Sequence, residues 1–517
     1  MQMTLDQLPA NWDLVVVGGG ITGAGVFREA VAQGVRTLLI EKHDFAWGTS
    51  SRSSKLVHGG LRYLRQGQIG LTRESVKERE WLLRKAPGLV TPIHFVMPLY
   101  QNGGPRRWEM KLGLTIYDLL AGRYQHKFLD VARTTGCLPH LRCAGLTGAY
   151  RFKDAQTDDA RLVLRLIWDG VAAGGVASNY TQAVEILRNR KGDIEGLEVA
   201  DSDTGATRTL RTRTVINATG VWAARLDPHT GRQLGMRPLR GSHLILPREV
   251  LPLDLAVSFM HPEDRRAVFV EPWEGVVLLG TTDLDHEGDL DAEPIITSDE
   301  VDYLLAFVQY YFPGAAINRQ TCVGTLSGVR PVLRHGHRSP SAESREHAVR
   351  ASKGLVTVTG GKLTTFRVLA RDALRAAQAW LPGLKCPPAY PPFESVTINP
   401  PTHVAVSLWQ TLCGRYGAIV ARQLLQSEPA LLQSIANTRW VWAELRHAVC
   451  HEGVRHLDDL LLRRVRVGLV RPREGPALLD RVQSMCTPHL PWDATRWQDE
   501  RRRYEDICQR LSEPLRG

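Results

Sequence analysis

The sequence predicts an α/β protein with a parallel N-terminal unit, an antiparallel sheet domain after it and an all-helical C-terminal domain. Three observations support this prediction: a glycine-punctuated βαβ pattern over residues 13–41, β-rich segments at 240–246, 267–272 and 276–280, and a mostly helical pattern over 404–505. A chain of 517 residues is long enough for two or three domains with substantial cores.

The βαβ pattern has the features of a dinucleotide-binding unit. Residues 14–17 are consecutive apolar residues, typical of a buried parallel strand, and Gly18, Gly20 and Gly23 follow at G-x-G-x-x-G spacing. A helix is expected over 26–33, and a second strand over 35–40 ends at Glu41. The glycines permit a tight turn, close approach to a pyrophosphate and packing of the helix on the strand, while the helix N-terminus attracts phosphate. Glu41 is placed to accept the hydroxyls of a ribose, which favours FAD or NAD over NADP.

Composition restricts the classes of protein that fit. The hydrophobic and charged fractions, 43% and 23%, are those of an ordinary globular protein, and no apolar run is long enough to span a membrane. Residues 1–12 are too short and polar for a signal peptide, so we expect a cytoplasmic protein or one that sits on a membrane without crossing it. The eight scattered cysteines predict reduced thiols, and no zinc spacing appears among the histidines, so no metal site is expected. The net charge of +11 favours phosphorylated substrates or anionic lipid, whereas no nucleic-acid-binding module is apparent.

A hydroxyl-rich segment at 49–56 follows the glycine fingerprint. It is either a surface loop or a loop that hydrogen-bonds phosphate and ring-edge atoms, and its position favours the second. Residues 18–25, 49–51, 53–56 and 58–64 together resemble the FAD-dependent glycerol-3-phosphate dehydrogenases, which belong to the same fold group as D-amino-acid and glycine oxidases. The segments 158–162, 217–220, 280–283, 328–331, 344–347, 360–367 and 457–469 continue the resemblance in family order. Trp47 is a local departure, because a small residue is expected there.

The resemblance implies a domain organisation. A FAD-binding Rossmann-like fold of the glutathione-reductase/D-amino-acid-oxidase type is expected, with an antiparallel-sheet substrate domain and an all-α C-terminal domain. The FAD-dependent oxidoreductase domain would cover 13–385, with FAD-binding parts at about 13–90, 155–225 and 350–385 and substrate-binding parts at about 91–154 and 226–349. A proline-rich linker at 386–400 would lead to a helical domain at 401–517.

The resemblance also implies an activity: oxidation of sn-glycerol 3-phosphate to dihydroxyacetone phosphate by hydride transfer to FAD, with electrons passed to a membrane quinone. Phosphate binding would use Arg62, Arg345 and Lys362, with a hydroxyl contact from Tyr63. Arg330 would stabilise the developing alkoxide. His58 either acts as the general base or orients a neighbouring group or the flavin. The cofactor-binding residues would be Gly18, Gly20, Gly23, Glu41, Thr49, Ser50, Ser54, Lys55, Leu56, Ala218, Gly220, Gly361, Leu363 and Thr364.

Three further segments have alternative interpretations. The helix expected at 106–120 places Trp108, Leu112, Thr115, Ile116, Leu119 and Leu120 on one face, which packs either on the core or into a lipid monolayer, next to Arg106, Arg107 and Lys111. Asp158 and Asp159 are expected to cap a helix over 162–173. The run Arg463-Arg464-Val465-Arg466 is either a solvated helix face or a packing element.

The expected partners are sn-glycerol 3-phosphate, a membrane quinone and an anionic membrane surface, with the protein held at the inner face of the cytoplasmic membrane. The oligomeric state is open, with a homodimer among the alternatives. An oxidase that reduces oxygen would use the same residues, whereas a non-enzymatic flavin-binding adaptor would have no need of the cluster of substrate cations.

Overall fold

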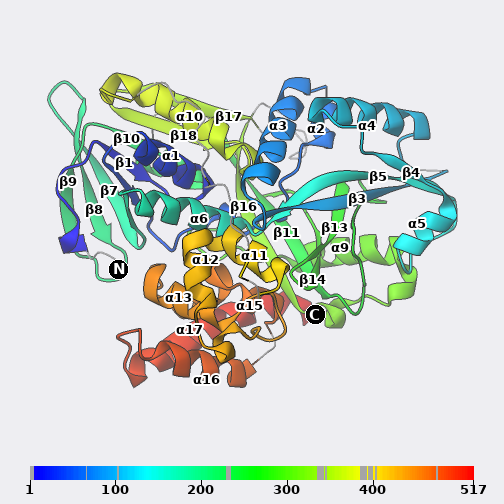
Figure 1. Ribbon diagram of the computed structural model, residues 1–517. Helices are drawn as coiled ribbons and strands as arrows, with labels where there is room; N and C mark the ends of the chain where they lie inside the picture. The colour runs from blue at the N-terminus through cyan, green and yellow to red at the C-terminus, as the bar shows by residue number, and fades with distance from the viewer. Residues whose placement is uncertain are drawn as a thin grey trace.

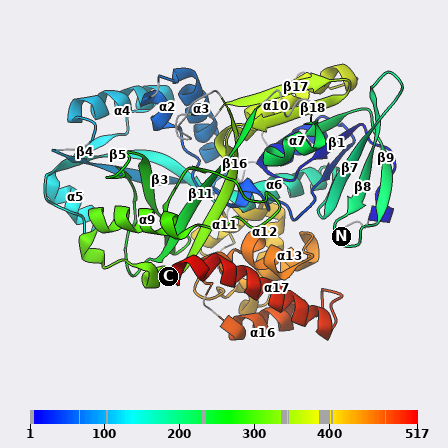
Figure 2. The ribbon, with the colours of Figure 1, turned by 180° about the vertical axis from the view of Figure 1, so that it is seen from behind.

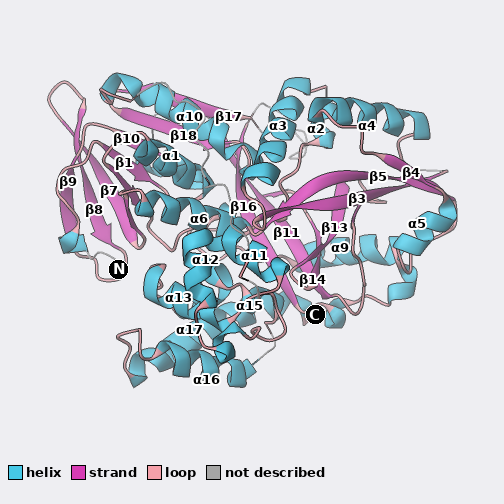
Figure 3. Cartoon of the chain, in the orientation of Figure 1, coloured by secondary structure: helices cyan, strands magenta, loops and turns pink. Residues whose placement is uncertain are grey.

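The computed structural model describes residues 5–65, 67–101, 104–228, 235–334, 343, 346–384, 393, 400–401, 404–472 and 475–516. Two sheets stand side by side, and a layer of helices from the C-terminal part of the chain lies below both of them (Figures 1 and 2). Figure 3 shows that the upper part of the molecule combines strands with helices, whereas the lower part is helical.

The first sheet carries the dinucleotide-binding pattern. Its strand order is β17-β18-β10-β1-β2-β6, in which β17 is antiparallel to β18 and the other neighbours are parallel. The strands are β1 (Leu14–Val17), β2 (Thr37–Ile40), β6 (Val176–Ser178), β10 (Val215–Asn217), β17 (His347–Ser352) and β18 (Leu355–Gly360). Parallel strands must be joined by crossovers, and the helices α1 (Ile21–Ala32), α6 (Asp159–Ala172) and α10 (Phe366–Ala377) pack together on one face.

The alternation of side chains along β1 explains why both faces of this sheet are covered. Leu14 and Val16 pack into the core beneath the helices, whereas Val15 and Val17 pack against Leu197 in a second layer. That layer is a three-stranded antiparallel sheet of β7 (Thr181–Arg188), β8 (Ile194–Asp201) and β9 (Thr207–Arg211).

The second sheet is mostly antiparallel, as the sequence predicts. Its order is β15-β11-β14-β13-β12-β3-β5-β4, and β16 pairs with β11. The strands are β3 (Val90–Tyr100), β4 (Lys127–Leu129), β5 (Leu146–Thr157), β11 (Met236–Pro247), β12 (Ala256–Met260), β13 (Ala267–Trp273), β14 (Val276–Gly280), β15 (Leu284–Asp285) and β16 (Gly324–Leu333). The helices of this region are α2 (Leu61–Arg65), α3 (Ile69–Lys85), α4 (Arg107–Ala121), α5 (Val131–Cys137) and α9 (Ser298–Tyr311), whereas α7 (Ala223–Leu226) lies against β7 and β18.

The apolar face of α4 that the sequence indicates does not pack on the core. Its buried apolar side chains are Met110, Leu114 and Tyr117, whereas Trp108 and Leu119 are 61% and 72% exposed. The helix therefore has apolar residues on both faces, and the face singled out from the sequence is the outer one. No helix in the described part of the chain is both long enough and apolar enough to cross a membrane.

The C-terminal part is helical, and its helices are α11 (Val406–Tyr416), α12 (Ala418–Leu425), α13 (Trp442–His451), α14 (Leu457–Asp459), α15 (Val467–Val470), α16 (Gly475–Cys486) and α17 (Ala494–Ser512). A π-helical turn, η10 (Leu460–Arg464), joins α14 to α15. The solvated interpretation of the basic run is wrong, because Arg463, Arg464 and Arg466 are buried and ion-paired. Most of the expected linker at 386–400 lies outside the described residues; Phe393 within it is buried in the core of the first sheet.

Candidate active site

A large cleft of about 1400 Å³ runs from the first sheet to the second. It is lined by the turn after β1, the loop 47–64, the ends of β10 and β18, and residues of β12, β13 and β16. In open α/β sheets ligands bind beyond the carboxyl ends of the strands, and β1, β10 and β18 all end at this cleft. The position and size of the cleft suit an extended dinucleotide with a small substrate at one end.

Two of the three fingerprint glycines, Gly18 and Gly23, are required by close packing against backbone atoms. Gly18 has φ +111°, and a Cβ there would lie 2.6 Å from the carbonyl oxygen of Ala218. A Cβ on Gly23 would lie 1.8 Å from the carbonyl oxygen of Gly18, so the first turn of α1 can pack on β1 only without a side chain at this position. Gly20 lines the cleft beside Ser50, and a Cβ there would lie 3.1 Å from Ser50 Oγ.

Glu41 lies where the second strand reaches the same cleft. Its Oε2 accepts from Gly19 N at 2.7 Å and its Oε1 from His43 N at 2.9 Å, so the carboxylate is fixed in orientation. Burial raises the pKa of Glu41, and the two backbone N–H groups oppose that rise. Each carboxylate oxygen keeps a second acceptor position, so the group can still receive ribose hydroxyls.

The loop 49–56 divides its side chains between the cleft and the interior. Ser50 Oγ accepts from Ile21 N at 2.9 Å at the start of α1, and Ser54 Oγ lies 2.9 Å from His243 Nε2. Thr49 donates to the carbonyl of Val329, and Leu56 lines the cleft beside these residues. Lys55 differs from the others, because its side chain is fully buried and its Nζ bonds to Asp159 and to the carbonyl of Ser51. It holds the loop from behind and does not reach the cleft.

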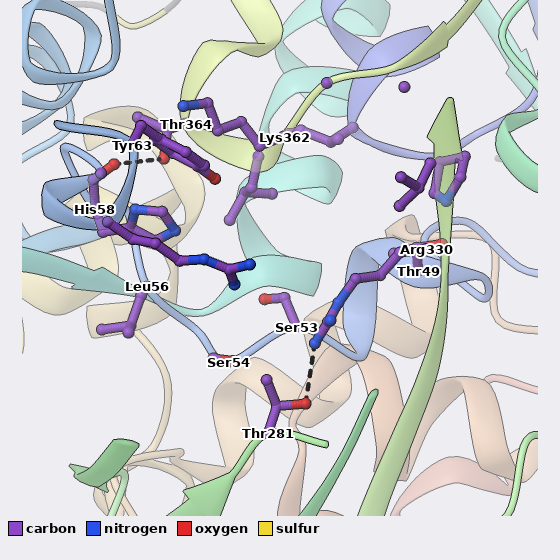
Figure 4. A pocket seen from close by; sticks show the side chains of 18 of the residues that line it. Thr49, Ser53, Ser54, Leu56, His58, Tyr63, Thr281, Arg330, Lys362 and Thr364 are labelled. Atoms are coloured by element: carbon purple, nitrogen blue, oxygen red, sulfur yellow. Dashed lines mark hydrogen bonds between the residues drawn. The ribbon is translucent and has the colours of Figure 1, made fainter. Parts of the chain in front are cut away.

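The remaining residues that are expected to bind the cofactor lie at the ends of two later strands, β10 and β18. Ala218 and Gly220 follow β10, and Ala218 N donates to the carbonyl of Val17 at 2.9 Å. Gly361, Leu363 and Thr364 follow β18, and Thr364 Oγ1 donates to the carbonyl of His58 at 3.3 Å (Figure 4). Three segments that are distant in the sequence thus meet around one cavity.

Arg330 is held rigidly at the opposite side of the cleft. Its Nη1 donates to Asp283 Oδ1 at 3.0 Å and its Nη2 to Thr281 Oγ1 at 2.9 Å. The Arg330 side chain remains 26% exposed, whereas the Asp283 side chain is 1% exposed. Figure 4 shows that Arg330 and Thr281 face His58 and Tyr63 across the pocket. A fixed, partly exposed guanidinium is suited to stabilising an oxyanion.

Lys362 provides a second cation in the cleft. Its Nζ lies 4.1 Å from the centroid of the Tyr63 ring and donates to the hydroxyl of Ser75. Burial lowers the pKa of Lys362 to about 7, and the nearby Glu74 carboxylate opposes that shift. Arg62, a residue of α2, lines the same cleft. Arg345 lies outside the described residues, whereas Arg62, Tyr63, Arg330, Lys362 and His58 are all brought to one cleft.

Several functional residues were missed from the sequence. His243 is 1% exposed beside Ser54, and its burial together with Arg330 lowers the pKa of the imidazole to about 3. Thr281 and Asp283 orient Arg330, and Arg266 Nη2 donates to the carbonyl of Thr281 at 2.7 Å. The motif at 280–283 was noticed as a match to the family, but nothing local in the sequence indicates its arginine partner.

The residues fit a flavin dinucleotide. Gly20 has no side chain, so the backbone at the start of α1 stays open beside Ser50. A pyrophosphate can approach the helix N-terminus and its dipole there. The fixed carboxylate of Glu41 suits an adenosine ribose, and the turn after β18 reaches the opposite end of the cleft. The fold and this cleft together define a flavin-dependent oxidoreductase.

Comparison with known proteins identifies the family. Residues 13–371 match the model of the FAD dependent oxidoreductase family, and residues 370–497 match the C-terminal domain of alpha-glycerophosphate oxidase. A glycerol-3-phosphate dehydrogenase of Mycobacterium leprae is 36% identical over 519 residues, covering 94% of this chain and 86% of that protein. The chain therefore belongs to the FAD-dependent glycerol-3-phosphate dehydrogenase family. The expected family, fold class and FAD cofactor are confirmed.

Other relatives agree with this assignment. An aerobic glycerol-3-phosphate dehydrogenase of Staphylococcus haemolyticus is 36% identical over 368 residues, or 70% of this chain and 66% of that protein. The structure of the glycerol-3-phosphate dehydrogenase from Bacillus halodurans complexed with FAD has the same fold, with a TM-score of 0.74, 24% identity and coverage of 98% and 96% of the two chains. The L-alpha-glycerophosphate oxidase of Mycoplasma pneumoniae shares the fold at a TM-score of 0.56 and 18% identity, over 71% of this chain and 94% of that one.

Proposed function

We propose that this protein oxidises sn-glycerol 3-phosphate to dihydroxyacetone phosphate with FAD and passes the electrons to a membrane quinone. The observation that carries the proposal is that Lys362, Arg62 and Arg330 share one cleft with the dinucleotide cradle. A phosphate dianion and a developing alkoxide both require cationic donors, whereas an amino-acid substrate would need a single arginine for its carboxylate. The names of the relatives, glycerol-3-phosphate dehydrogenases, point to the same substrate.

The side chains divide the work between binding and proton transfer. The turn at residues 18–23 and Glu41 would hold FAD, which would supply a hydride acceptor for the oxidation at C2 of the substrate. Lys362 and Arg62, with the hydroxyl of Tyr63, hold the phosphate, and we assign Arg345 to the same group from the sequence. Arg330, fixed by Asp283 and Thr281, stabilises the negative charge on the C2 oxygen as its proton leaves.

His58 is the proposed acceptor of the C2 hydroxyl proton. It lines the cleft, its ring centroid is 6.1 Å from that of Tyr63, and its carbonyl is tied to Thr364. The alternative is that His58 orients Tyr63 and the substrate. A His58→Gln variant distinguishes the two roles. If His58 is the base, the wild-type fall in turnover at low pH disappears in the variant, whereas loss of an orienting group lowers turnover equally at every pH.

The outer rim of the cleft carries exposed apolar side chains, which favour a lipid-soluble electron acceptor. Ile69, Trp108, Leu112 and Ile116 line the mouth of the cleft, and the first three are more than half exposed. Arg106, Arg107 and Lys111 lie on the same helical segment and suit anionic headgroups. We therefore propose that α4 docks on the inner face of the cytoplasmic membrane and that the quinone reaches the flavin through this rim.

The deciding experiment follows the flavin absorbance of purified holoenzyme under anaerobic conditions. Addition of sn-glycerol 3-phosphate should bleach the flavin rapidly, and a quinone analogue should restore the absorbance faster than air. Restoration that is faster with air than with the quinone would identify an oxidase. Bound flavin that is not bleached would show that the proposed substrate is wrong, while the FAD assignment would stand.

A further inference from the structure

A four-residue segment of the C-terminal domain, 463–466, contacts the chain that lines the cofactor cleft at two places, Asp44 before the loop 49–56 and Ser51 within it. At one end, Arg463 Nε and Arg464 Nη1 donate to Asp44 Oδ2 at 2.5 and 2.6 Å, and Arg464 Nη2 donates to Asp44 Oδ1 at 2.7 Å. Asp44 lies three residues after Glu41, where the chain turns from the ribose position toward the hydroxyl-rich loop. All three side chains are buried.

Arg466 holds the other end of the same loop. Its Nη2 donates to the carbonyl of Ser51 at 2.8 Å, and its Nη1 donates to Asp159 Oδ1 at 2.8 Å and Asp158 Oδ1 at 3.1 Å. The side chain is 1% exposed and lies 5.4 Å from the Trp273 ring. One guanidinium therefore joins the cofactor loop to the first turn of α6.

Asp159 extends this contact along the loop. It accepts from Ser53 N at 2.9 Å, from Ser53 Oγ at 2.7 Å and from Lys55 Nζ at 2.8 Å. Lys55 also donates back to the carbonyl of Ser51 at 2.8 Å, so the network closes on itself. Asp158, by contrast, caps α6 by accepting from Arg161 N, as the sequence predicts.

The two sides of the loop have different tasks. Ser50 and Ser54 face the cleft, whereas Lys55 and the carbonyl of Ser51 face the buried ions. Charges buried this deeply are costly unless oppositely charged or hydrogen-bonding groups lie beside them, so loss of Arg466 would leave Asp159 with one cation fewer. A displacement of Arg466 would leave the Ser51 carbonyl without this donor and would free the loop to move relative to the cleft.

We propose that Arg466 is a positioning residue of the flavin site: acting through the Ser51 carbonyl and Asp159, it fixes the loop 49–56 against the cofactor, so that the C-terminal domain completes the FAD site. The inference rests on the cofactor site proposed above. It gives the basic run at 463–466 a task in cofactor binding, although none of its residues lines the cleft.

The test uses the full-length protein with Arg466→Gln, Arg466→Lys and a matched control, Glu452→Gln. Glu452 forms a buried ion pair with Arg161 of α6 at 2.5 Å, which also joins the C-terminal domain to this helix but does not touch the loop. Three quantities are measured: the dissociation constant of FAD, deuterium exchange of loop peptides in the apoprotein, and the rate of flavin bleaching at saturating FAD.

Arg466→Gln should weaken FAD binding at least about tenfold, because the loss of one charge-assisted hydrogen bond corresponds to about that change in affinity. It should also raise deuterium exchange in the loop 49–56. The half-saturating concentration of sn-glycerol 3-phosphate should change less than about twofold, because the substrate cations lie on other elements. Arg466→Lys keeps the charge and one donor group, so its FAD affinity should fall between those of Arg466→Gln and the wild type. Glu452→Gln should lower the melting temperature without changing FAD affinity or loop exchange.

A second variant tests the inference if Arg466→Gln does not fold. Ser53→Ala removes a hydroxyl that donates to Asp159 and accepts from Lys55 N, and it leaves every buried charge in place; it should raise loop exchange and weaken FAD binding by at least about threefold. The inference is overturned if these variants lose thermal stability while FAD affinity and loop exchange match the wild type. Failure of the substrate to bleach wild-type flavin would count against the proposed substrate and would leave the FAD comparison intact.

Discussion

The ammonium of Lys362 lies over the ring of Tyr63, with Nζ 4.1 Å from the ring centroid. Tyr63 is 8% exposed, and the same ammonium donates to Ser75. The cation is thus placed by an aromatic face and a hydroxyl, and both contacts leave part of its hydrogen-bonding capacity for a ligand. Burial disfavours the charged form of Lys362 and therefore lowers the pKa of its ammonium.

The pH dependence of substrate capture should report this lysine. The pKa of Lys362 is lowered to about 7, so the side chain is cationic below that pH and neutral above it. The efficiency kcat/KM should therefore fall about tenfold per pH unit above pH 7, since this parameter reports the free enzyme. Lys362→Arg, which stays charged, should have a lower but flat profile between pH 7 and 9. A flat wild-type profile in that range would contradict the assignment of Lys362 to the phosphate.

Removal of the Arg330 guanidinium should slow catalysis without releasing the cofactor. Arg330→Ala should lower the rate of flavin bleaching at least about a hundredfold, as for other oxyanion donors. The flavin content of the purified variant should equal that of the wild type, because the cofactor cradle is built from other strands. Stopped-flow absorbance measures the rate, and unchanged bleaching would remove Arg330 from the chemistry.

Gly23→Ala should eliminate cofactor binding. The added Cβ would lie 1.8 Å from the Gly18 carbonyl oxygen, so α1 must move away from β1. We expect protein that purifies without yellow colour and melts at a lower temperature. Gly136→Ala in α5 is the control, because no described atom outside its own helix and chain neighbours comes within 4 Å of the position that a Cβ would take there. Full flavin content in Gly23→Ala would show that the tight helix–strand contact is not needed.

The exposed face of α4 should determine membrane binding. A Leu112→Ser/Leu119→Ser double variant should weaken sedimentation with anionic vesicles at least about tenfold, because two large apolar side chains no longer enter the bilayer. Activity with a water-soluble dye should be unchanged. The control is Val406→Ser/Ile419→Ser, which alters residues that are 56% and 68% exposed on α11 and α12. Equal losses in both double variants would exclude α4 as the specific docking surface.

Local patterns were sufficient to predict the βαβ unit at residues 14–40 and the tight turn after its first strand. Glycine spacing, strand composition and the acid at position 41 are local signals, and the glycines at 18 and 23 occupy positions where a Cβ would collide with backbone. The orientation of α4 could not be predicted in this way, because both of its faces carry apolar residues and periodicity does not say which one is covered.

The burial of the basic run at 463–466 could not be predicted from the sequence either. Three cations within four residues are typical of a solvated helix face, and the carboxylates that neutralise Arg464 and Arg466 lie more than 300 residues earlier. The inward position of the Lys55 side chain could not be predicted for the same reason: its neighbours 54 and 56 line the cleft, whereas its own partner, Asp159, belongs to α6.

The attachment of the cofactor loop to residues 463–466 has a consequence for biosynthesis. The glycine cradle leaves the ribosome early, whereas Arg466 is added more than 400 residues after Lys55, a delay of about 20–80 s at ordinary elongation rates. During that interval Asp44 and Asp159 lack their C-terminal counterions, Arg464 and Arg466. Flavin loading is therefore expected to follow completion of the chain, and chains terminated before residue 463 would contain the whole cradle yet fail to retain the cofactor.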